Sequence, residues 1–334
     1  MSLEMQPNEM LVSWMVDDIE VPATLARPEG TGPFPAVIFV AGSGPTDRNW
    51  NSPLIPGTNG SAALLAQALA GAGFLSLRYD KRPSGAKGQE NAMRMLGKIS
   101  MQSHMDELAS GVRLLAARPE VAPGQIFALT NSEGAVHALN YQASAPEIPF
   151  AGLVLTAPPG RTVGAVGRSQ IAEQLAPVPG GDVILAAYDR AMEEFLAGQP
   201  VQVDESLPEG LKNLIKALTT PYNQPFAREL WTYDAIPVLE RVSVPVLILI
   251  GKKDVQVDWQ ADGQMFEAAA QRHPNITLVY LENANHVLKH EPRPRSELTG
   301  AVVAETYSGE GVPLDADTIR EIVSWLRSQE RDRV

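Results

Sequence analysis

Cysteine is absent from this chain of 334 residues. Without thiols the protein has no disulfide bond, no cysteine nucleophile and no cysteine-ligated metal ion. Basic residues are also few, because 27 Lys and Arg stand against 39 Asp and Glu, a formal net charge of −12. Nucleic acids bind to clustered positive charge, and the sequence has no stripe of Lys or Arg. We therefore expect no nucleic-acid partner.

Long apolar runs are missing as well. No window approaches the roughly 18 apolar residues of a membrane-spanning helix, and the first ten residues lack the basic and apolar regions of a secretory signal. These absences predict no membrane span, and either a cytoplasmic location or a signal that has been removed. With 44% hydrophobic and 20% charged residues, the composition is that of a globular protein. We expect one large domain with an insertion, as a monomer or a weak homo-oligomer.

The residues that could hold a metal or cofactor do not form a recognisable pattern. His286 and His290 are one helical turn apart, but the sequence identifies no third ligand. The glycine-rich stretches match neither a phosphate-binding loop nor a dinucleotide fingerprint. We expect no metal and no cofactor.

Short apolar runs alternate with amphipathic stretches through most of the chain. After a hairpin at 10–27, strands are predicted at 36–40, 74–79, 126–129, 153–156, 244–251 and 276–281. Helices are predicted at 61–70 and 315–329, and a further one from Ser103, with Asp106 completing a capping box. This alternation is typical of an α/β fold in which helices cover both faces of a mostly parallel sheet.

The alternation stops between residues 157 and 235, where helical periodicity continues without a strand. We predict a core domain of residues 1–156 and 236–334, with 157–235 inserted as a helical cap. An insertion here would cover the carboxyl ends of the strands, where open α/β sheets bind their ligands.

The most informative segment is 130–134, Thr-Asn-Ser-Glu-Gly, because it joins the strand at 126–129 to a helix of small residues. A serine at the apex of such a strand-turn-helix is raised towards the substrate. Ser132 is therefore the candidate nucleophile, and its alternative role is that of a helix N-cap. A serine hydroxyl needs a nearby base, since it is not ionised at neutral pH.

Candidates for the acid and the base follow later strands. Asp254 comes three residues after the strand at 244–251, and His286 lies on the turn after 276–281. The order Ser, Asp, His is a known order of a catalytic triad. His290 remains an alternative base, whereas Asp258 and Asp262 are placed at a helix start. The other histidines precede the acid in the chain or end a helix: His104, His137 and His273.

Several of these segments also resemble those of one family. The segment 42–48 reads Gly-Ser-Gly-Pro-Thr-Asp-Arg, and further similarities lie at 78–82, 131–134, 251–257 and 285–289. The chain thus resembles the α/β-hydrolase superfamily, and more narrowly the bacterial serine carboxylesterases with a Gly-Ser-Gly-Pro-x-Asp-Arg loop. That family usually has Gly at the position of Thr130 and often His at that of Asn131.

The backbone N–H groups that would bind an oxyanion are predicted at two places. One is Glu133, the residue after the nucleophile. The resemblance places the other at Ser43. The alternative interpretation is that residues 42–44 form only a tight turn. Charged residues on neighbouring loops are interpreted as ion pairs that brace this loop, with a substrate-carboxylate role for Arg48 or Arg82 as the alternative: Asp47, Arg48, Arg78, Asp80 and Arg82.

The sequence thus predicts a serine carboxylesterase that acts on small to medium acyl esters through an acyl-enzyme. A thioesterase or a peptide acyl hydrolase would use the same residues. A catalytically silent protein that binds a small ligand is the alternative from another class.

Overall fold

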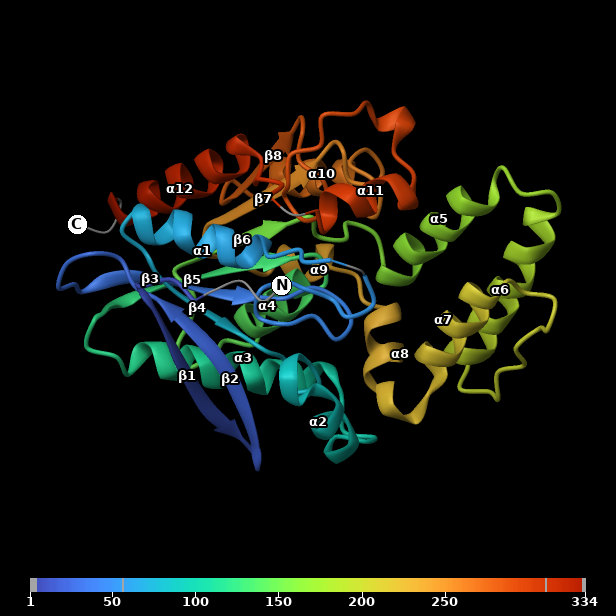
Figure 1. The fold of residues 1–334 in the computed structure, drawn as a ribbon, viewed down its shortest axis with the longest axis horizontal. Helices are drawn as coiled ribbons and strands as arrows, with labels where there is room; N and C mark the ends of the chain where they lie inside the picture. The colour runs from blue at the N-terminus through green and yellow to red at the C-terminus, as the bar shows by residue number, and fades with distance from the viewer. Residues whose placement is uncertain (1–4, 56, 310, 332–334) are drawn as a thin grey trace.

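The computed structural model of the protein describes residues 5–55, 57–309 and 311–331. An eight-stranded sheet with the order β1-β2-β4-β3-β5-β6-β7-β8 runs through its centre (Figure 1). The strands are β1 (Glu9–Val16), β2 (Ile19–Ala26), β3 (Phe34–Val40), β4 (Leu75–Tyr79), β5 (Val121–Asn131), β6 (Gly152–Thr156), β7 (Val246–Gly251) and β8 (Ile276–Leu281). Strands β3 to β8 are parallel, and β2 is antiparallel to both of its neighbours.

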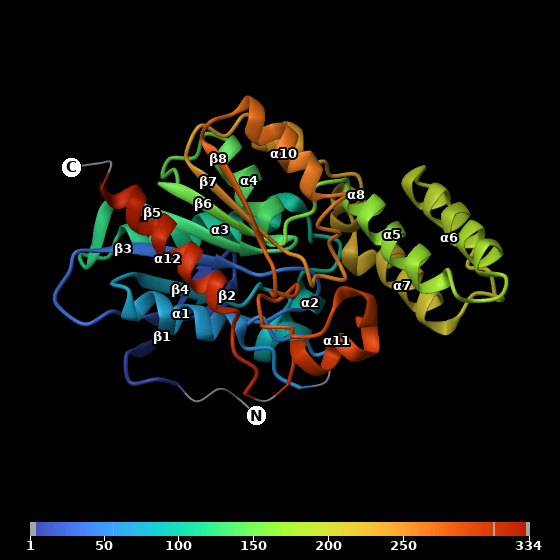
Figure 2. The same cartoon turned by 90° about the horizontal axis from the view of Figure 1, so that it is seen from above.

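Helices cover both faces of this sheet (Figures 1 and 2). One face is packed by α1 (Ser61–Gly71) and α12 (Ala316–Arg331). The other is packed by α3 (Met101–Ala116), α4 (Gly134–Ala143), α9 (Ile236–Leu239) and α10 (Gly263–Arg272). Two short helices, α2 (Gly88–Arg94) and α11 (Gly300–Tyr307), belong to connections after β4 and β8. The predicted α/β-hydrolase arrangement of sheet and helices is confirmed.

The central strands β6 and β7 are buried on both faces of the sheet, and the candidate site residues lie in loops at the strand ends. Strand β7 reads Val-Leu-Ile-Leu-Ile-Gly, and all six residues are buried. All five residues of β6 are buried as well. Strands covered on both faces carry mostly apolar side chains along their length. Because parallel strands end at the same edge, the loops that follow β5, β7 and β8 lie close together.

Helix α3 begins earlier than its predicted start at Ser103. Its N-cap is Ser100, whose extended backbone lets its hydroxyl accept the N–H of Ser103 at 3.0 Å. Ser103 closes the capping box, since its own hydroxyl accepts the N–H of Ser100. Asp106 instead binds Gln102 one turn away. The prediction of a capping box formed by Ser103 and Asp106 is wrong. Ser100, three residues earlier, is the N-cap, and Ser103 is its reciprocal partner.

Residues 157–235, here called the helical insertion, contain no strand, and all of them are described. They form α5 (Val163–Leu175), α6 (Gly181–Leu196), α7 (Glu209–Thr219) and α8 (Phe226–Trp231). These helices share an apolar cluster that is separate from the two clusters of the sheet, with Tyr188, Phe195 and Ile215 at its centre. In both views the insertion projects to one side of the sheet (Figures 1 and 2).

Candidate active site

Ser132 lies on a strained turn between β5 and α4. Its φ of 52° is in the left-handed region, which L-residues other than Asn and Asp rarely adopt. The turn is held by the Ser132 N–H, which donates to the carbonyl of Thr156 at 2.9 Å. Gly134 is required next, because a Cβ there would lie 2.3 Å from the carbonyl oxygen of Val40. A strained serine that its surroundings hold in place is typical of a functional site.

Thr130 and Asn131, which differ from the family's usual residues, both fit. Thr130 is fully buried in β5, and its hydroxyl donates to the carbonyl of Val154 on the neighbouring strand. The side-chain amide of Asn131 donates to the backbone carbonyl of His286 at 2.9 Å. Asn131 therefore joins the loop that bears the serine to the loop that bears the histidine. No pattern in the sequence indicates this contact.

His286 and Asp254 are brought together as the chain order predicts. The Nδ1 atom of His286 lies 2.8 Å from Oδ2 of Asp254. The other carboxylate oxygen of Asp254 accepts the backbone N–H groups of Gln256 and Val257 at 2.7 and 3.0 Å. Asp254 is fully buried, so these bonds compensate its loss of water. With Nδ1 bound, Nε2 is the ring atom left to act on a substrate.

Tyr307 of α11 packs against the imidazole of His286. The two rings are nearly parallel, at 16°, with centroids 6.4 Å apart. Burial raises the pKa of Tyr307 well above its usual range, so the phenol is neutral. No sequence pattern indicates Tyr307, because α11 lies in a connection whose position depends on the fold.

The rival acids and bases lie elsewhere. His290 is partly exposed and pairs with Asp315 at 3.1 Å. Asp262 precedes α10, as expected, but its carboxylate binds Arg161 and the backbone N–H groups of residues 160 and 161. Asp258 caps the turn that follows it. None of these side chains lines the cavities at Ser132 that are described below.

The backbone N–H groups of Ser43 and Glu133 remain available. Among the residues that the structure describes, no acceptor binds either group. Glu133 is buried, and buried N–H groups are almost always paired, so its free N–H beside Ser132 indicates a place for an anion. Ser43 is exposed, so its N–H is open to a ligand or to water. Gly42 lets the Ser43 loop close on the serine, since a Cβ there would lie 3.3 Å from the Cβ of Ser132.

Behind these donors lies a buried polar cluster that consists of Lys81, Glu133, His137, His104 and Glu107. Glu133 is 3.2 Å from Nε2 of His137 and 3.8 Å from Nζ of Lys81. Burial alone would raise the pKa of Glu133, but Lys81 and the His137 hydrogen bond outweigh it and hold this pKa at about 2. Burial lowers the pKa of His137, so its ring is neutral at neutral pH. The Glu133 side chain is therefore a buried carboxylate that is paired on two sides.

Four of the five charged residues around the Ser43 loop form ion pairs, as expected, and Asp47 instead accepts the backbone N–H groups of residues 49 and 51. Only one of the pairs lies within the predicted set. Arg48 binds Asp80 through two nitrogens, at 2.7 and 3.1 Å. Arg78 binds Glu9, and Arg82 binds Glu107 at 2.8 Å. Neither Arg48 nor Arg82 lines the cavities at Ser132. Their contacts favour bracing over the binding of a substrate carboxylate.

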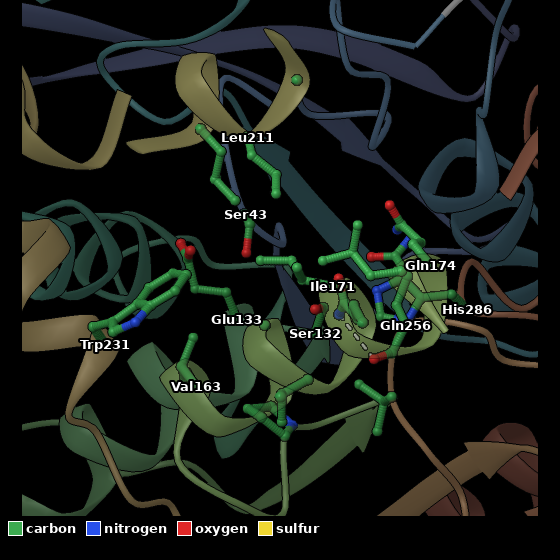
Figure 3. A pocket seen from close by; sticks show the side chains of 18 of the residues that line it. Ser43, Ser132, Glu133, Val163, Ile171, Gln174, Leu211, Trp231, Gln256 and His286 are labelled. Atoms are coloured by element: carbon green, nitrogen blue, oxygen red, sulfur yellow. Dashed lines mark hydrogen bonds between the residues drawn. The ribbon is translucent and has the colours of Figure 1, made fainter. Parts of the chain in front are cut away.

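Two cavities meet at Ser132 and His286. The larger, about 670 Å³, lies between these residues and the helical insertion (Figure 3). Its outer walls are mostly apolar side chains of α5, α7 and α8: Val163, Val166, Ile171, Leu175, Leu211, Leu214 and Trp231. The smaller, about 120 Å³, has a more polar wall that includes Thr46, Ser52, Asn59 and Ser308. Ser43 borders both cavities, and Glu133 borders the larger.

Two further findings concern the described residues as a whole. Within them, no three His, Asp or Glu side chains come close enough to hold a metal ion. No helix in the described ranges has both the length and the apolar character needed to cross a bilayer.

Comparison with known proteins agrees with this fold. Residues 37–300 match the model of the alpha/beta hydrolase family, so the chain belongs to that family. Esterase EstD of Thermotoga maritima is 23% identical over 280 residues, which cover 80% of this chain and 58% of EstD. The chain therefore spans little more than half of that relative's length.

Solved structures show the same fold at low sequence identity. Proline iminopeptidase of Mycobacterium smegmatis is 14% identical, with a TM-score of 0.58 over 97% of this chain and 100% of that one. An esterase of Pyrococcus furiosus is 16% identical, with a TM-score of 0.54 over 96% and 92% of the two chains. At these identities the likeness concerns the fold.

Proposed function

We propose that the protein is a serine carboxylesterase with Ser132 as nucleophile, His286 as base and Asp254 as the residue that orients the histidine. One observation carries this proposal. The strained Ser132 turn lines the same cavity as the imidazole of His286, whose Nδ1 is bound to the buried carboxylate of Asp254. The esterase name of the relative from Thermotoga maritima adds support. The loop at 42–48 would place the protein in the bacterial carboxylesterase branch.

The reaction would follow from these positions. The Ser132 hydroxyl attacks the ester carbonyl while Nε2 of His286 takes its proton. The N–H groups of Ser43 and Glu133 bind the oxyanion of the tetrahedral intermediate. The alcohol leaves with the proton from His286, and an acyl group remains on Ser132. A water molecule, deprotonated by His286, then attacks the acyl carbonyl and releases the carboxylic acid.

The walls of the two cavities indicate which side of the ester goes where. The larger cavity offers apolar side chains along α5 and α7, so we assign it to an acyl chain, whose burial gains about 0.8 kcal/mol per CH₂. The smaller, polar cavity suits a short alcohol. Residues 157–235 would then act as a cap that sets acyl preference, on a core of 1–156 and 236–334.

A fluorophosphonate probe followed by peptide mapping tests the nucleophile. We expect a single labelled peptide that contains Ser132, and no label in Ser132→Ala. A protein that stays unlabelled while folded would be a silent ligand-binding protein instead.

A panel of p-nitrophenyl esters from acetate to decanoate, with matched thioesters and anilides, tests the bond and the chain length. We expect esters to be preferred, with an optimum beyond acetate. Ile171→Trp should shift this optimum towards shorter chains, since Ile171 borders the larger cavity (Figure 3). An unchanged optimum in this variant would remove the acyl chain from that cavity.

A further inference from the structure

Lys81 lies just past the end of β4, with its side chain almost entirely buried. Its ammonium donates a hydrogen bond of 2.6 Å to the carbonyl oxygen of Gly42. A buried ammonium is costly unless it is paired, so this position needs a reason. The two partners of Lys81 suggest the reason. One is the carbonyl of Gly42, which precedes Ser43, and the other is the side chain of Glu133; Ser43 and Glu133 carry the two free backbone N–H groups.

The Gly42 carbonyl and the Ser43 N–H are two ends of one peptide unit. That unit is planar, and in its trans form the two groups point in opposite directions. A bond that fixes the carbonyl therefore also fixes the direction of the N–H. The ammonium also polarises the carbonyl, and hydrogen bonds in such a chain strengthen one another.

The second partner of Lys81 is the side chain of Glu133, whose Oε1 lies 3.8 Å from the ammonium. The backbone N–H of Glu133 is the other free donor beside Ser132. His137, which also binds this carboxylate, is neutral, so the positive charge that balances Glu133 comes from Lys81. One side chain is thus connected to both donor residues.

We propose that Lys81 is a positioning residue that holds both backbone donors, Ser43 N–H and Glu133 N–H, in the geometry that binds the oxyanion. The inference rests on the proposed esterase function. Lys81 borders neither cavity and does not touch the substrate. Its effect is to keep the donors fixed before the charge develops, which is where such sites gain their rate.

The first test is Lys81→Met, assayed with the best p-nitrophenyl ester and expressed per active site titrated with a fluorophosphonate. Loss of one oxyanion donor in a hydrolase costs about 10²- to 10³-fold in kcat, and loosened donors should cost less, about 10- to 100-fold. We expect this fall in kcat with KM within about threefold. The affinity for an alkylboronic acid, which forms a tetrahedral adduct with the serine, should fall by a similar factor.

A matched control is Lys253→Met. The ammonium of Lys253 also binds a backbone carbonyl, that of Arg293 at 2.7 Å, and its side chain borders neither cavity. We expect its kcat within about twofold of the parent. A merely structural lysine at position 81 would behave like this control, with unchanged kcat per titrated site and unchanged boronate affinity, and that result would overturn the inference.

The absence of cysteine allows a direct rescue. Lys81→Cys provides the only thiol, which can be alkylated in denaturant with 2-bromoethylamine to restore an ammonium at nearly the original length. After refolding, this sample should regain most of the lost kcat per titrated site, whereas alkylation with bromoethane should not. Equal activity of the two alkylated samples would show that bulk, not the ammonium, matters.

The inference and the proposed function fail separately. If Ser132→Ala keeps its esterase activity, the function itself is wrong. If Ser132→Ala is inactive and the probe labels Ser132 but Lys81→Met keeps full kcat, only the role of Lys81 is wrong.

Discussion

Two buried pairs of a histidine and a carboxylate, His286 with Asp254 and His137 with Glu133, differ in what surrounds the ring. His286 is bound to Asp254 at 2.8 Å and borders both cavities. His137 is bound to Glu133 at 3.2 Å but packs against the rings of His104 and Phe226, with centroids 4.7 and 5.9 Å away.

A carboxylate partner therefore does not by itself identify a catalytic histidine. A base needs a ring nitrogen that reaches the substrate, and burial must not exclude the substrate from it. In His137 the second nitrogen, Nδ1, is enclosed and has no partner among the described residues. We therefore interpret His137 as a structural residue that packs α4 against its neighbours, and His286 as the base.

Removal of each histidine should give the largest contrast. We expect His286→Ala to lose about 10⁴-fold or more in kcat, as Ser132→Ala should, because the members of a triad act as a unit. His137→Phe keeps a ring between His104 and Phe226 and should stay within about tenfold. Ester hydrolysis by purified variants of equal far-UV signal decides this. Equal losses in both histidine variants would reverse our interpretation.

The two carboxylates provide the next contrast. Asp254→Asn should lower kcat by about 10³-fold, because an amide no longer holds the tautomer that the reaction needs. Glu133→Gln keeps its backbone N–H and should lose about tenfold or less. Initial rates at saturating ester concentration measure both. A Glu133→Gln variant as inactive as Asp254→Asn would give that side chain a direct part in the chemistry.

The sequence predicted the fold and the outline of the site for one physical reason. Apolar runs define buried strands, and the residues that end them must lie at one edge of a parallel sheet. Ser132, Asp254 and His286 could all be found this way. Their positions in the structure agree with that expectation, although their chemical roles remain proposals.

The supporting residues could not be found because burial and pairing are properties of the folded chain. Lys81 is far in sequence from Gly42, and Asn131 is far from His286, so no local pattern links them. Tyr307 reaches the imidazole from a helix that the sequence did not reveal. The burial of the Glu133 side chain has no sequence signal either, because Glu is mostly exposed in folded proteins.

The pH dependence should follow the accessible histidine alone. On the acid side of neutrality kcat/KM should rise with pH, since only a neutral imidazole can take the serine proton. Burial lowers the pKa of His137, so its ring is neutral at neutral pH. His137→Phe should therefore show the same profile as the parent, measured in buffers of constant ionic strength. A profile that changes in this variant would mean that the two rings titrate together.

The last prediction concerns the free energy of unfolding. The buried pair of Glu133 and His137 should contribute more to stability than it does to catalysis. The pKa of Glu133 is about 2, below its ordinary value of 4.5, so the folded state favours the ionised carboxylate. A depressed pKa contributes stability above about pH 5, and this contribution disappears as pH falls towards 2.

Glu133→Gln should thus lower the free energy of unfolding by about 2 kcal/mol at pH 7, and the difference from the parent should shrink between pH 5 and pH 3. Urea unfolding at each pH measures it, with Glu282→Gln as an exposed control that should change stability by less than about 0.5 kcal/mol. If the gap between Glu133→Gln and the parent were the same at pH 3 as at pH 7, the buried charge would not be its cause.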